Sequence, residues 1–175
     1  MNTLTILQRG APVLAAIATP IDNIHAAEIT RLIADLKVTV TQANGVGIAA
    51  PQVGKSLRLF LMCSAPSERY PDAPLLPLTV VINPKILKVS SCQALGWEGC
   101  LSVKGKRALV SRYENIDVSY FDETGIKHNK TFTGFLARIF QHELDHLDGI
   151  TFIERLSDES DAIDEQQWRE QLLNT

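Results

Sequence analysis

The spacing of apolar side chains predicts helices near both ends of the chain. Residues 26–43 carry apolar side chains every three or four positions, which is typical of a helix packed on one face. The same spacing returns from residue 135 onward. The apolar face of this second helix comprises Leu136, Ile139, Phe140 and Leu147. A weaker terminal helix is predicted over residues 161–173, with Trp168 as its anchor.

The middle of the chain is instead rich in β-branched and aromatic residues, which favour strands. The stretch LRLFLMC (57–63) predicts a buried strand, and residues 78–90 and 108–123 predict further strands. The turn ETGI precedes KHNKTFTG, which indicates a hairpin. Because strands follow one helix and precede another without alternating with helices, we expect an α+β fold with antiparallel sheets.

Two segments between these elements are predicted to be irregular. GVGIAAPQVG (45–54) suits a tight loop whose backbone approaches another group closely, because its glycines and proline cannot continue a helix. The stretch 64–77 contains four prolines and is expected to decorate the surface rather than border a binding site.

Composition limits the classes of function. The 175 residues are 45% hydrophobic and 21% charged, which predicts one globular domain over residues 1–175. A net charge of −3 gives no basic footprint for nucleic acid, and no apolar run is long enough to span a membrane. Three cysteines without regular spacing and an N-terminus without a signal-peptide pattern indicate a reducing compartment, the cytoplasm.

The stretch QHELDHLDG (141–149) contains the pattern H-E-x-x-H within the second helix. Positions four apart lie on one helical face, so His142 and His146 can bind one metal ion. Glu143 lies close enough to handle protons on a water that the ion activates. This short pattern also occurs by chance on solvated helices, but two histidines and a glutamate on an apolar helix face would be costly to bury without a partner.

A catalytic site of this kind needs a third protein ligand. The longer pattern H-E-x-x-H-x-x-G-x-x-H fails here, since Phe152 occupies the position of the third histidine. Glu154 and Glu165 are weak candidates, the first because it follows a glycine break closely and the second because its segment is polar. Cys100, in GWEGCLSV, remains the best candidate, because thiolates bind divalent ions strongly, although an isolated cysteine is more often structural.

Three blocks together resemble the signature of the peptide deformylase family: GVGIAAPQ (45–52), EGCLS (98–102) and QHELDH (141–146). The resemblance extends from ILQRGAPVL near the start to HLDGITFIERLS (146–157). It implies antiparallel sheets surrounding a central helix that carries the H-E-x-x-H motif. It also implies a hydrolase that removes the formyl group from the N-terminal methionine of new polypeptides and releases formate, and we expect it to act near the ribosome exit.

Carried onto this chain, the resemblance implies a metal site of Cys100, His142 and His146, with Glu143 as general base and acid. The expected ion is Fe²⁺, although a cysteine and two histidines also suit Zn²⁺, Ni²⁺ and Co²⁺. The substrates are N-formylmethionyl nascent peptides, with neither nucleic acid nor membrane as a partner.

The resemblance also implies an oxyanion hole made by the side-chain amide of Gln52 and the backbone N–H of Leu101. Gly47 is expected to contact the peptide backbone in the manner of a strand. The expected pocket for the methionine side chain comprises Val46, Trp97, Arg138 and Ile139. The chain departs from many relatives at Lys104-Gly105, where they have Pro-Gly, so its peptide preference beyond methionine is expected to differ from theirs.

Two other functions fit the motif. A zincin-like protease would cleave internal peptide bonds and tolerate replacement of Cys100. A structural metal module would need a fourth protein ligand, and the remaining histidines, His25 and His128, lie in polar settings that favour exposure to solvent.

Overall fold

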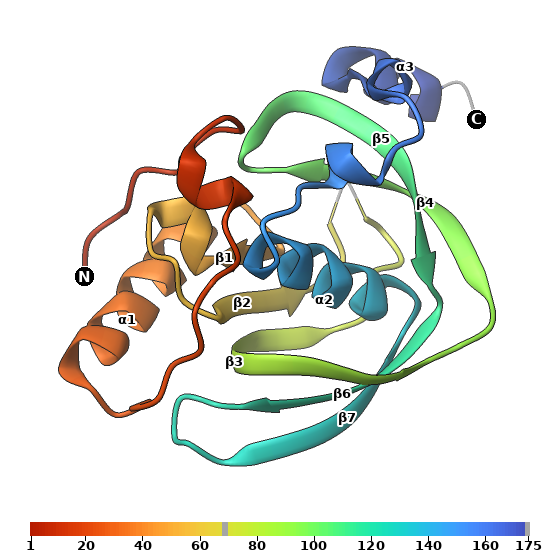
Figure 1. Cartoon of the computed structure of the whole chain (residues 1–175). Helices are drawn as coiled ribbons and strands as arrows, with labels where there is room; N and C mark the ends of the chain where they lie inside the picture. The colour runs from red at the N-terminus through yellow and green to blue at the C-terminus, as the bar shows by residue number, and fades with distance from the viewer. Residues whose placement is uncertain (68–69, 174–175) are drawn as a thin grey trace.

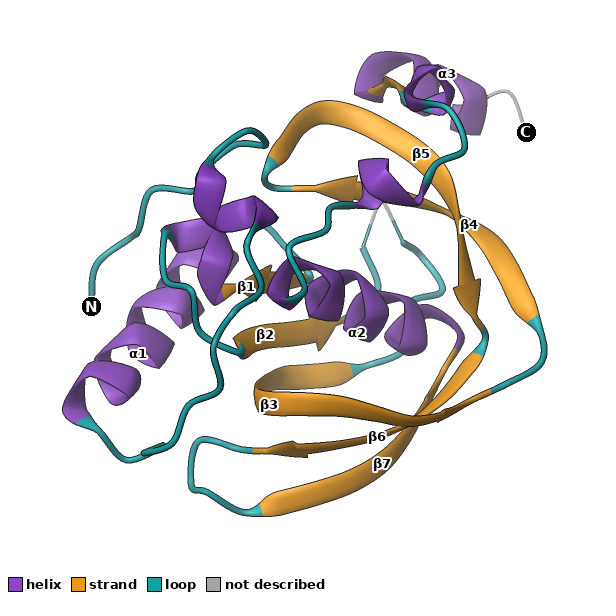
Figure 2. Ribbon diagram, viewed as in Figure 1, coloured by secondary structure: helices purple, strands orange, loops and turns teal. Residues whose placement is uncertain are grey.

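In the computed structural model, which describes residues 1–67 and 70–173, two antiparallel sheets enclose helix α2 (Gly134–Leu147) (Figures 1 and 2). The first sheet has the order β1 (Gly47–Ala49), β2 (Leu59–Ser64), β3 (Leu76–Val89), β6 (Asn115–Phe121), β7 (Lys127–Thr133). The second has the order β4 (Gln93–Cys100), β5 (Val103–Tyr113), β8 (Ile163–Asp164). The other α-helices are α1 (Ala27–Gln42) and α3 (Glu165–Leu173), and single 3₁₀ turns cover Pro12–Ala15, Ala50–Val53, Phe152–Arg155 and Glu159–Asp161. The α+β class and both long helices are thus confirmed.

The position of strand β2 between two helices explains why residues 59–62 are apolar without interruption. Leu59 and Leu61 are fully buried in the cluster formed with α1, whereas Phe60 and Met62 are fully buried in the cluster formed with α2. Successive side chains of a strand point to opposite faces, so a helix on each face requires an apolar residue at every position.

None of the described helices is long and apolar enough to cross a membrane.

Helix α2 is held against the first sheet by aromatic packing. Phe140 is fully buried and meets Phe60 edge-on at 5.2 Å between ring centroids, and its ring lies 5.6 Å from that of Phe132. These contacts come from β2 and β7, so they fix the helix across the sheet. The expected apolar face of the helix is confirmed at Ile139, Phe140 and Leu147, while Leu136 is only partly buried.

The sequence did not reveal β4, because glycines weaken the strand pattern of QALGWEGC. The structure shows why glycine is needed there. A Cβ atom on Gly96 would lie 2.7 Å from the guanidinium carbon of Arg138, and one on Gly99 would lie 2.6 Å from that of Arg107. The guanidinium group of each arginine therefore occupies the space that a side chain at the glycine position would need.

Residues 108–123, predicted as one strand region, form parts of two strands in different sheets. The chain leaves the second sheet after Tyr113 and enters the first at Asn115, and the Glu114 N–H donates to the Cys92 carbonyl at the crossing. The predicted hairpin after Phe121 is confirmed as β6 paired with β7.

The segment 45–54, predicted as a loop, contains a short strand and a 3₁₀ turn. Residues 47–49 pair with β2, and the turn over residues 50–53 ends at Gly54, which has a φ of 80°. The terminal helix is confirmed but begins at Glu165, after the short strand β8. Trp168 anchors it as predicted, because its side chain is buried and the Arg107 guanidinium lies 4.5 Å from its ring.

Truncation of Phe140 tests whether aromatic packing holds α2 in place. We expect Phe140→Ala to lower the free energy of unfolding by about 3–5 kcal/mol, because it leaves a cavity between Phe60 and Phe132. Urea denaturation followed by circular dichroism measures the change. Leu95→Ala, at a site that is 68% exposed, is the control and should cost no more than about 0.5 kcal/mol. Equal losses for the two variants would contradict this assignment.

Candidate active site

The H-E-x-x-H residues on α2 meet the end of strand β4. The ring centroids of His142 and His146 are 5.2 Å apart, and the Cys100 sulfur lies 3.1 Å from Nε2 of His146. One ligand atom from each of these three residues falls within 4.8 Å of the others. The structure therefore brings together the cysteine and the two histidines that the sequence singled out, from elements 42 or more residues apart.

Charge within this cluster favours the ionised thiol. Burial alone would raise the pKa of Cys100, but the nearby charge of His146 and hydrogen bonds from both histidines lower that pKa to about 5. The pKa of His142 is raised, because burial, which lowers it, is outweighed by the hydrogen bonds that the ring donates to Cys100 and Glu98. The sulfur is thus prepared as an anionic ligand at neutral pH.

Glu98 orients His142, and the sequence analysis missed this role. Its carboxylate is 4% exposed and accepts hydrogen bonds from Nδ1 of His142 at 2.8 Å and from Nε and Nη2 of Arg112 at 2.9 and 3.0 Å. Arg138 is the third donating residue and adds a fourth hydrogen bond, at 2.9 Å. Burial raises the pKa of Glu98, yet His142 and Arg112 hold it well below its usual range. With Nδ1 engaged, Nε2 is the nitrogen of His142 that remains for a metal ion.

A second buried carboxylate extends this ion-pair network along the helix. Asp145 receives Nη1 of Arg112 at 2.6 Å and Nε of Arg155 at 3.0 Å. Arg112 therefore joins β5 to two points, the end of β4 at Glu98 and the middle of α2 at Asp145. Charged residues at inward-facing strand positions, such as Glu98 and Arg112, are the signal that would have indicated the network from sequence.

Glu143 lies beside the cluster without a protein partner for one oxygen. Its side chain is 4% exposed, and its Oε2 atom has no hydrogen bond within the described part of the chain. Burial is the main cause that raises the pKa of Glu143 to about 7. Gly47 makes room for this carboxyl group, since a Cβ atom there would collide with it. A buried carboxyl group in this state can both accept and release a proton near neutral pH.

Gln52 is held with its amide nitrogen toward the cluster. Its Oε1 atom accepts a hydrogen bond from the Ala49 N–H at 2.8 Å. Its Nε2 atom lies 3.1 Å from the Ser102 hydroxyl oxygen and 3.5 Å from the Cys100 sulfur. Because the oxygen is already engaged, the side chain presents its N–H groups to the cavity. Ser102 was not identified from the sequence.

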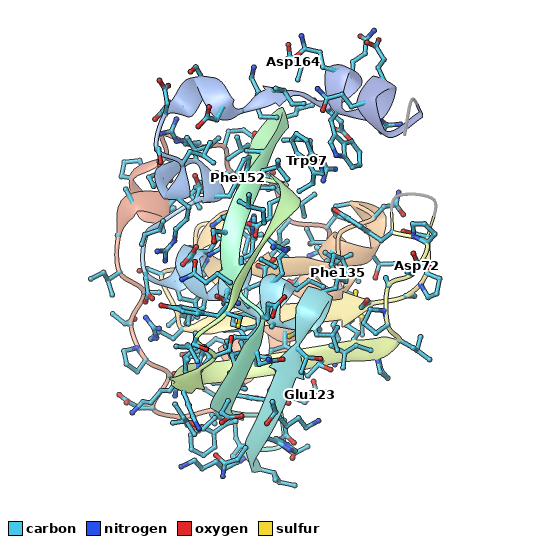
Figure 3. The ribbon with its side chains drawn as sticks, turned by 90° about the vertical axis from the view of Figure 1, so that its right-hand side faces the viewer. Asp72, Trp97, Glu123, Phe135, Phe152 and Asp164 are labelled. Atoms are coloured by element: carbon cyan, nitrogen blue, oxygen red, sulfur yellow. The ribbon has the colours of Figure 1, made fainter. Side chains whose placement is uncertain are left out.

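A cavity of about 360 Å³ opens beside the cluster, on the side of the molecule shown in Figure 3 with Trp97 and Phe135 labelled. The sequence-predicted residues that line it are Val46, Gly47, Gln52, Trp97, Cys100, Leu101, Arg138, Ile139, His142 and Glu143. His146 lies deeper, at 1% exposure. Arg138 has an additional role, because its guanidinium also donates to the carbonyls of Ala94, Gly96 and Val110 and so clamps the β4–β5 hairpin.

The expectation that residues 64–77 only decorate the surface is wrong. Tyr70 lines the cavity, packs 4.7 Å from the ring of Phe135 and accepts a hydrogen bond from Arg107 at 3.2 Å. The proline-rich composition predicted an irregular segment, but it did not predict that the segment would pass beside the cavity. Residues 68 and 69 of this segment lie outside the described residues.

The alternative third ligands are occupied elsewhere. Glu154 accepts hydrogen bonds from Arg9 and from Thr151, and Glu165 contacts Arg107 and Arg169. Phe152 is buried, with its ring 6.3 Å from that of His142. Within residues 1–67 and 70–173, the group able to hold a metal has three members and includes neither His25 nor His128. The geometry thus leaves the thiol as the third donor.

A thiol and two imidazoles around one point, next to a carboxyl group with one unpartnered oxygen in an open cavity, are characteristic of the class of metal-dependent hydrolases. A family model described as polypeptide deformylase matches residues 3–162. Peptide deformylase 2 of Nostoc sp. is 51% identical over 167 residues, which cover 95% of this chain and 93% of that relative.

Solved structures agree with the family match. The Met-Ala-Ser-bound class I type b peptide deformylase from Acinetobacter baumannii aligns with a TM-score of 0.86 and 44% identity, covering 88% of this chain and 98% of that one. An actinonin complex of the enzyme from Ehrlichia chaffeensis aligns with a TM-score of 0.83 and 32% identity, covering 91% and 92%. The chain therefore belongs to the peptide deformylase family, metal-dependent hydrolases that remove N-formyl groups from nascent peptides.

Two arginines that share Asp145 allow a test of the buried ion-pair network. We expect Arg112→Met to lower the free energy of unfolding by about 3–5 kcal/mol, because it leaves Glu98 and Asp145 buried with fewer cationic partners. Arg155→Met is the matched control. Its side chain is 45% exposed, so the loss should stay within about 1 kcal/mol. Thermal and urea denaturation measure both, and a smaller loss for Arg112→Met than for Arg155→Met would contradict the network's importance.

Proposed function

We propose that this chain removes the formyl group from the N-terminal methionine of newly made polypeptides, with Cys100, His142 and His146 as metal ligands. The observation that carries the proposal is the meeting of these three donors beside the buried carboxyl group of Glu143, whose Oε2 atom has no hydrogen-bond partner among the described residues. The products are formate and a free N-terminal amine. We propose that one catalytic domain spans residues 1–175.

The residues present fit a divalent metal ion. An anionic sulfur and two imidazole nitrogens are a donor set that suits Fe²⁺, and equally Zn²⁺, Ni²⁺ or Co²⁺. We propose Fe²⁺ as the native ion, following the family resemblance. When bound, the metal supplies a Lewis acid that acidifies water and polarises the formyl carbonyl. Glu98 would support it by holding the ring of His142 through Nδ1.

Glu143 is proposed as the general base and acid. Its carboxylate would take a proton from the attacking water as oxygen adds to the formyl carbon. It would then return the proton to the methionine nitrogen as the C–N bond breaks, so that no net proton remains on the enzyme. Burial supports this role by raising the pKa of Glu143 to about 7, so the group can take up and release a proton near neutral pH.

Gln52 and Leu101 are proposed to stabilise the negative charge that develops on the formyl oxygen. The side-chain N–H groups of Gln52 face the cavity because its oxygen is bound to the Ala49 N–H. Leu101 directly follows Cys100 and lines the same cavity, so its backbone N–H is close to the proposed ligand. Removing one donor of this kind typically costs about 10²–10³ in rate.

The peptide is proposed to lie along strand β1, the edge strand of the first sheet. An extended chain can add to such an edge through backbone hydrogen bonds, and Gly47 in this strand lies next to the Glu143 carboxyl group. Val46, Trp97 and Ile139 offer apolar surface for the methionine side chain, with Arg138 at the wall. This arrangement would place the formyl group between Glu143 and Gln52.

We further propose that the enzyme acts in the cytoplasm on chains close to the ribosome exit. Its net charge of −3 supports action on the nascent peptide without direct binding of nucleic acid.

The proposed reaction is tested by formate release. Protein loaded anaerobically with Fe²⁺, or with Ni²⁺, should release formate from formyl-Met-Ala, and a chelator should abolish the activity until metal is restored. An unformylated peptide with internal bonds serves as the control for a zincin-like protease. Cleavage of that peptide, or absence of formate from the formylated one, would overturn the proposal.

The role of Glu143 is tested separately by Glu143→Gln. We expect this variant to keep the metal content of the wild type but to lose at least about 10²-fold in kcat, since an amide cannot accept the proton. Metal analysis and the formate assay are made on the same preparation. Cys100→Ala is the comparison and should lose metal as well as activity. Full turnover by Glu143→Gln would exclude it as the base.

A further inference from the structure

Strand β5 begins with a bulge that borders the cavity. Glu98 pairs with Ala108 and Cys100 pairs with Val103, so Gly99 alone faces the four residues 104–107. Gly105 has a φ of 74°, a left-handed conformation that suits glycine. All four residues of this bulge line the cavity beside Cys100 and Leu101.

The bulge is fastened on several sides. The backbone N–H of Lys104 donates to Oε1 of Gln8 at 3.3 Å, and the Lys106 ammonium lies 2.8 Å from Asp164 of β8. Arg107 is buried and lies 3.3 Å from Glu165 at the start of α3. Figure 3 shows Asp164 on the segment above Trp97, where β8 pairs with β5. The backbone position of Lys104 is therefore held by its surroundings.

Lys104 differs from Lys106, Arg107 and Arg138, the other cationic residues of the cavity, because each of those has an acidic partner. Lys106 and Arg107 face Asp164 and Glu165, and Arg138 contacts Glu98. For the Lys104 side chain, by contrast, no acidic partner lies within ion-pair distance among the described residues, and the residue is exposed at the cavity. A cation held at the wall of a substrate cavity without a counter-charge is available to a substrate.

The chemistry of the cavity divides it into two regions. One wall is apolar, with Val46, Phe135 and Ile139, and suits the methionine side chain. The bulge of residues 104–107 presents charge instead, so it is a poor surface for methionine. The residues that follow methionine must leave the cavity, and the exposed bulge at its rim is the surface they would pass.

We propose that Lys104 is a specificity-determining residue that favours substrates with acidic side chains at the second and third positions after the formylated methionine. This inference rests on the proposed function, because it assumes that formylated peptides occupy the cavity. An ion pair at an exposed rim contributes modestly, and we expect about two- to fivefold in kcat/KM between peptides of opposite charge.

The test compares peptides of the form formyl-Met-Ala-Xaa-Xaa, in which both Xaa residues are Asp, Ser or Lys. With metal-loaded wild-type protein, kcat/KM should be highest for the Asp peptide and lowest for the Lys peptide. The ratio of these two values should fall toward one in 1 M salt, where the screening length drops to about 3 Å.

Two variants assign the preference to this side chain. Lys104→Gln should bring the Asp-to-Lys ratio to about one, and Lys104→Glu should invert it. Lys130→Gln is the matched control, since Lys130 is also an exposed lysine but lies on β7 away from the cavity, and it should keep the wild-type ratio.

The outcomes separate the two proposals. If the neutral Ser peptide releases no formate, the proposed function fails. If it is deformylated but the wild-type ratio is one, or if the ratio survives in Lys104→Gln, the role of Lys104 is overturned. A preference that disappears in Lys104→Gln and reverses in Lys104→Glu establishes it.

Discussion

The arrangement of the site depends on the hydrogen bonds that the buried carboxylate of Glu98 accepts. It takes hydrogen bonds from His142 on α2, from Arg112 on β5 and from Arg138 on α2, although it belongs to β4 itself. A carboxylate in the interior is tolerated only when cationic donors compensate for its lost hydration, and here these donors come from separate elements. The same carboxylate therefore holds the β4–β5 hairpin against the helix and orients the imidazole of His142.

The same dependence explains the sheet arrangement. Helix α2 lies on the first sheet through Phe140 and its aromatic neighbours, while the second sheet supplies Cys100 and the network around Arg112. Neither sheet carries a complete donor set by itself. The cluster exists because two sheets close around one helix, and the cavity remains where glycine at position 47 keeps β1 clear of Glu143.

Local patterns could be predicted from the sequence, and contacts between distant segments could not. The spacing of apolar residues predicted both long helices. Cys100 could be predicted as a ligand because Phe152 occupies the position where a third histidine would stand. Strand β4 was missed because Gly96 and Gly99 lower strand propensity, and their reason, the side chains of Arg138 and Arg107, lies elsewhere in the chain. The partner of His142 and the placement of Tyr70 at the cavity depend in the same way on tertiary packing, which periodicity does not encode.

The C-terminal segment forms part of the cavity wall. The family match ends at residue 162, yet Glu165 lines the cavity and Trp168 is buried against Arg107. The wall of the cavity therefore extends beyond the residues that the family model matches. Substitutions in this tail would change the outer wall while leaving the proposed ligands and the proposed base in place, so entry to the cavity and the centre itself can be altered separately.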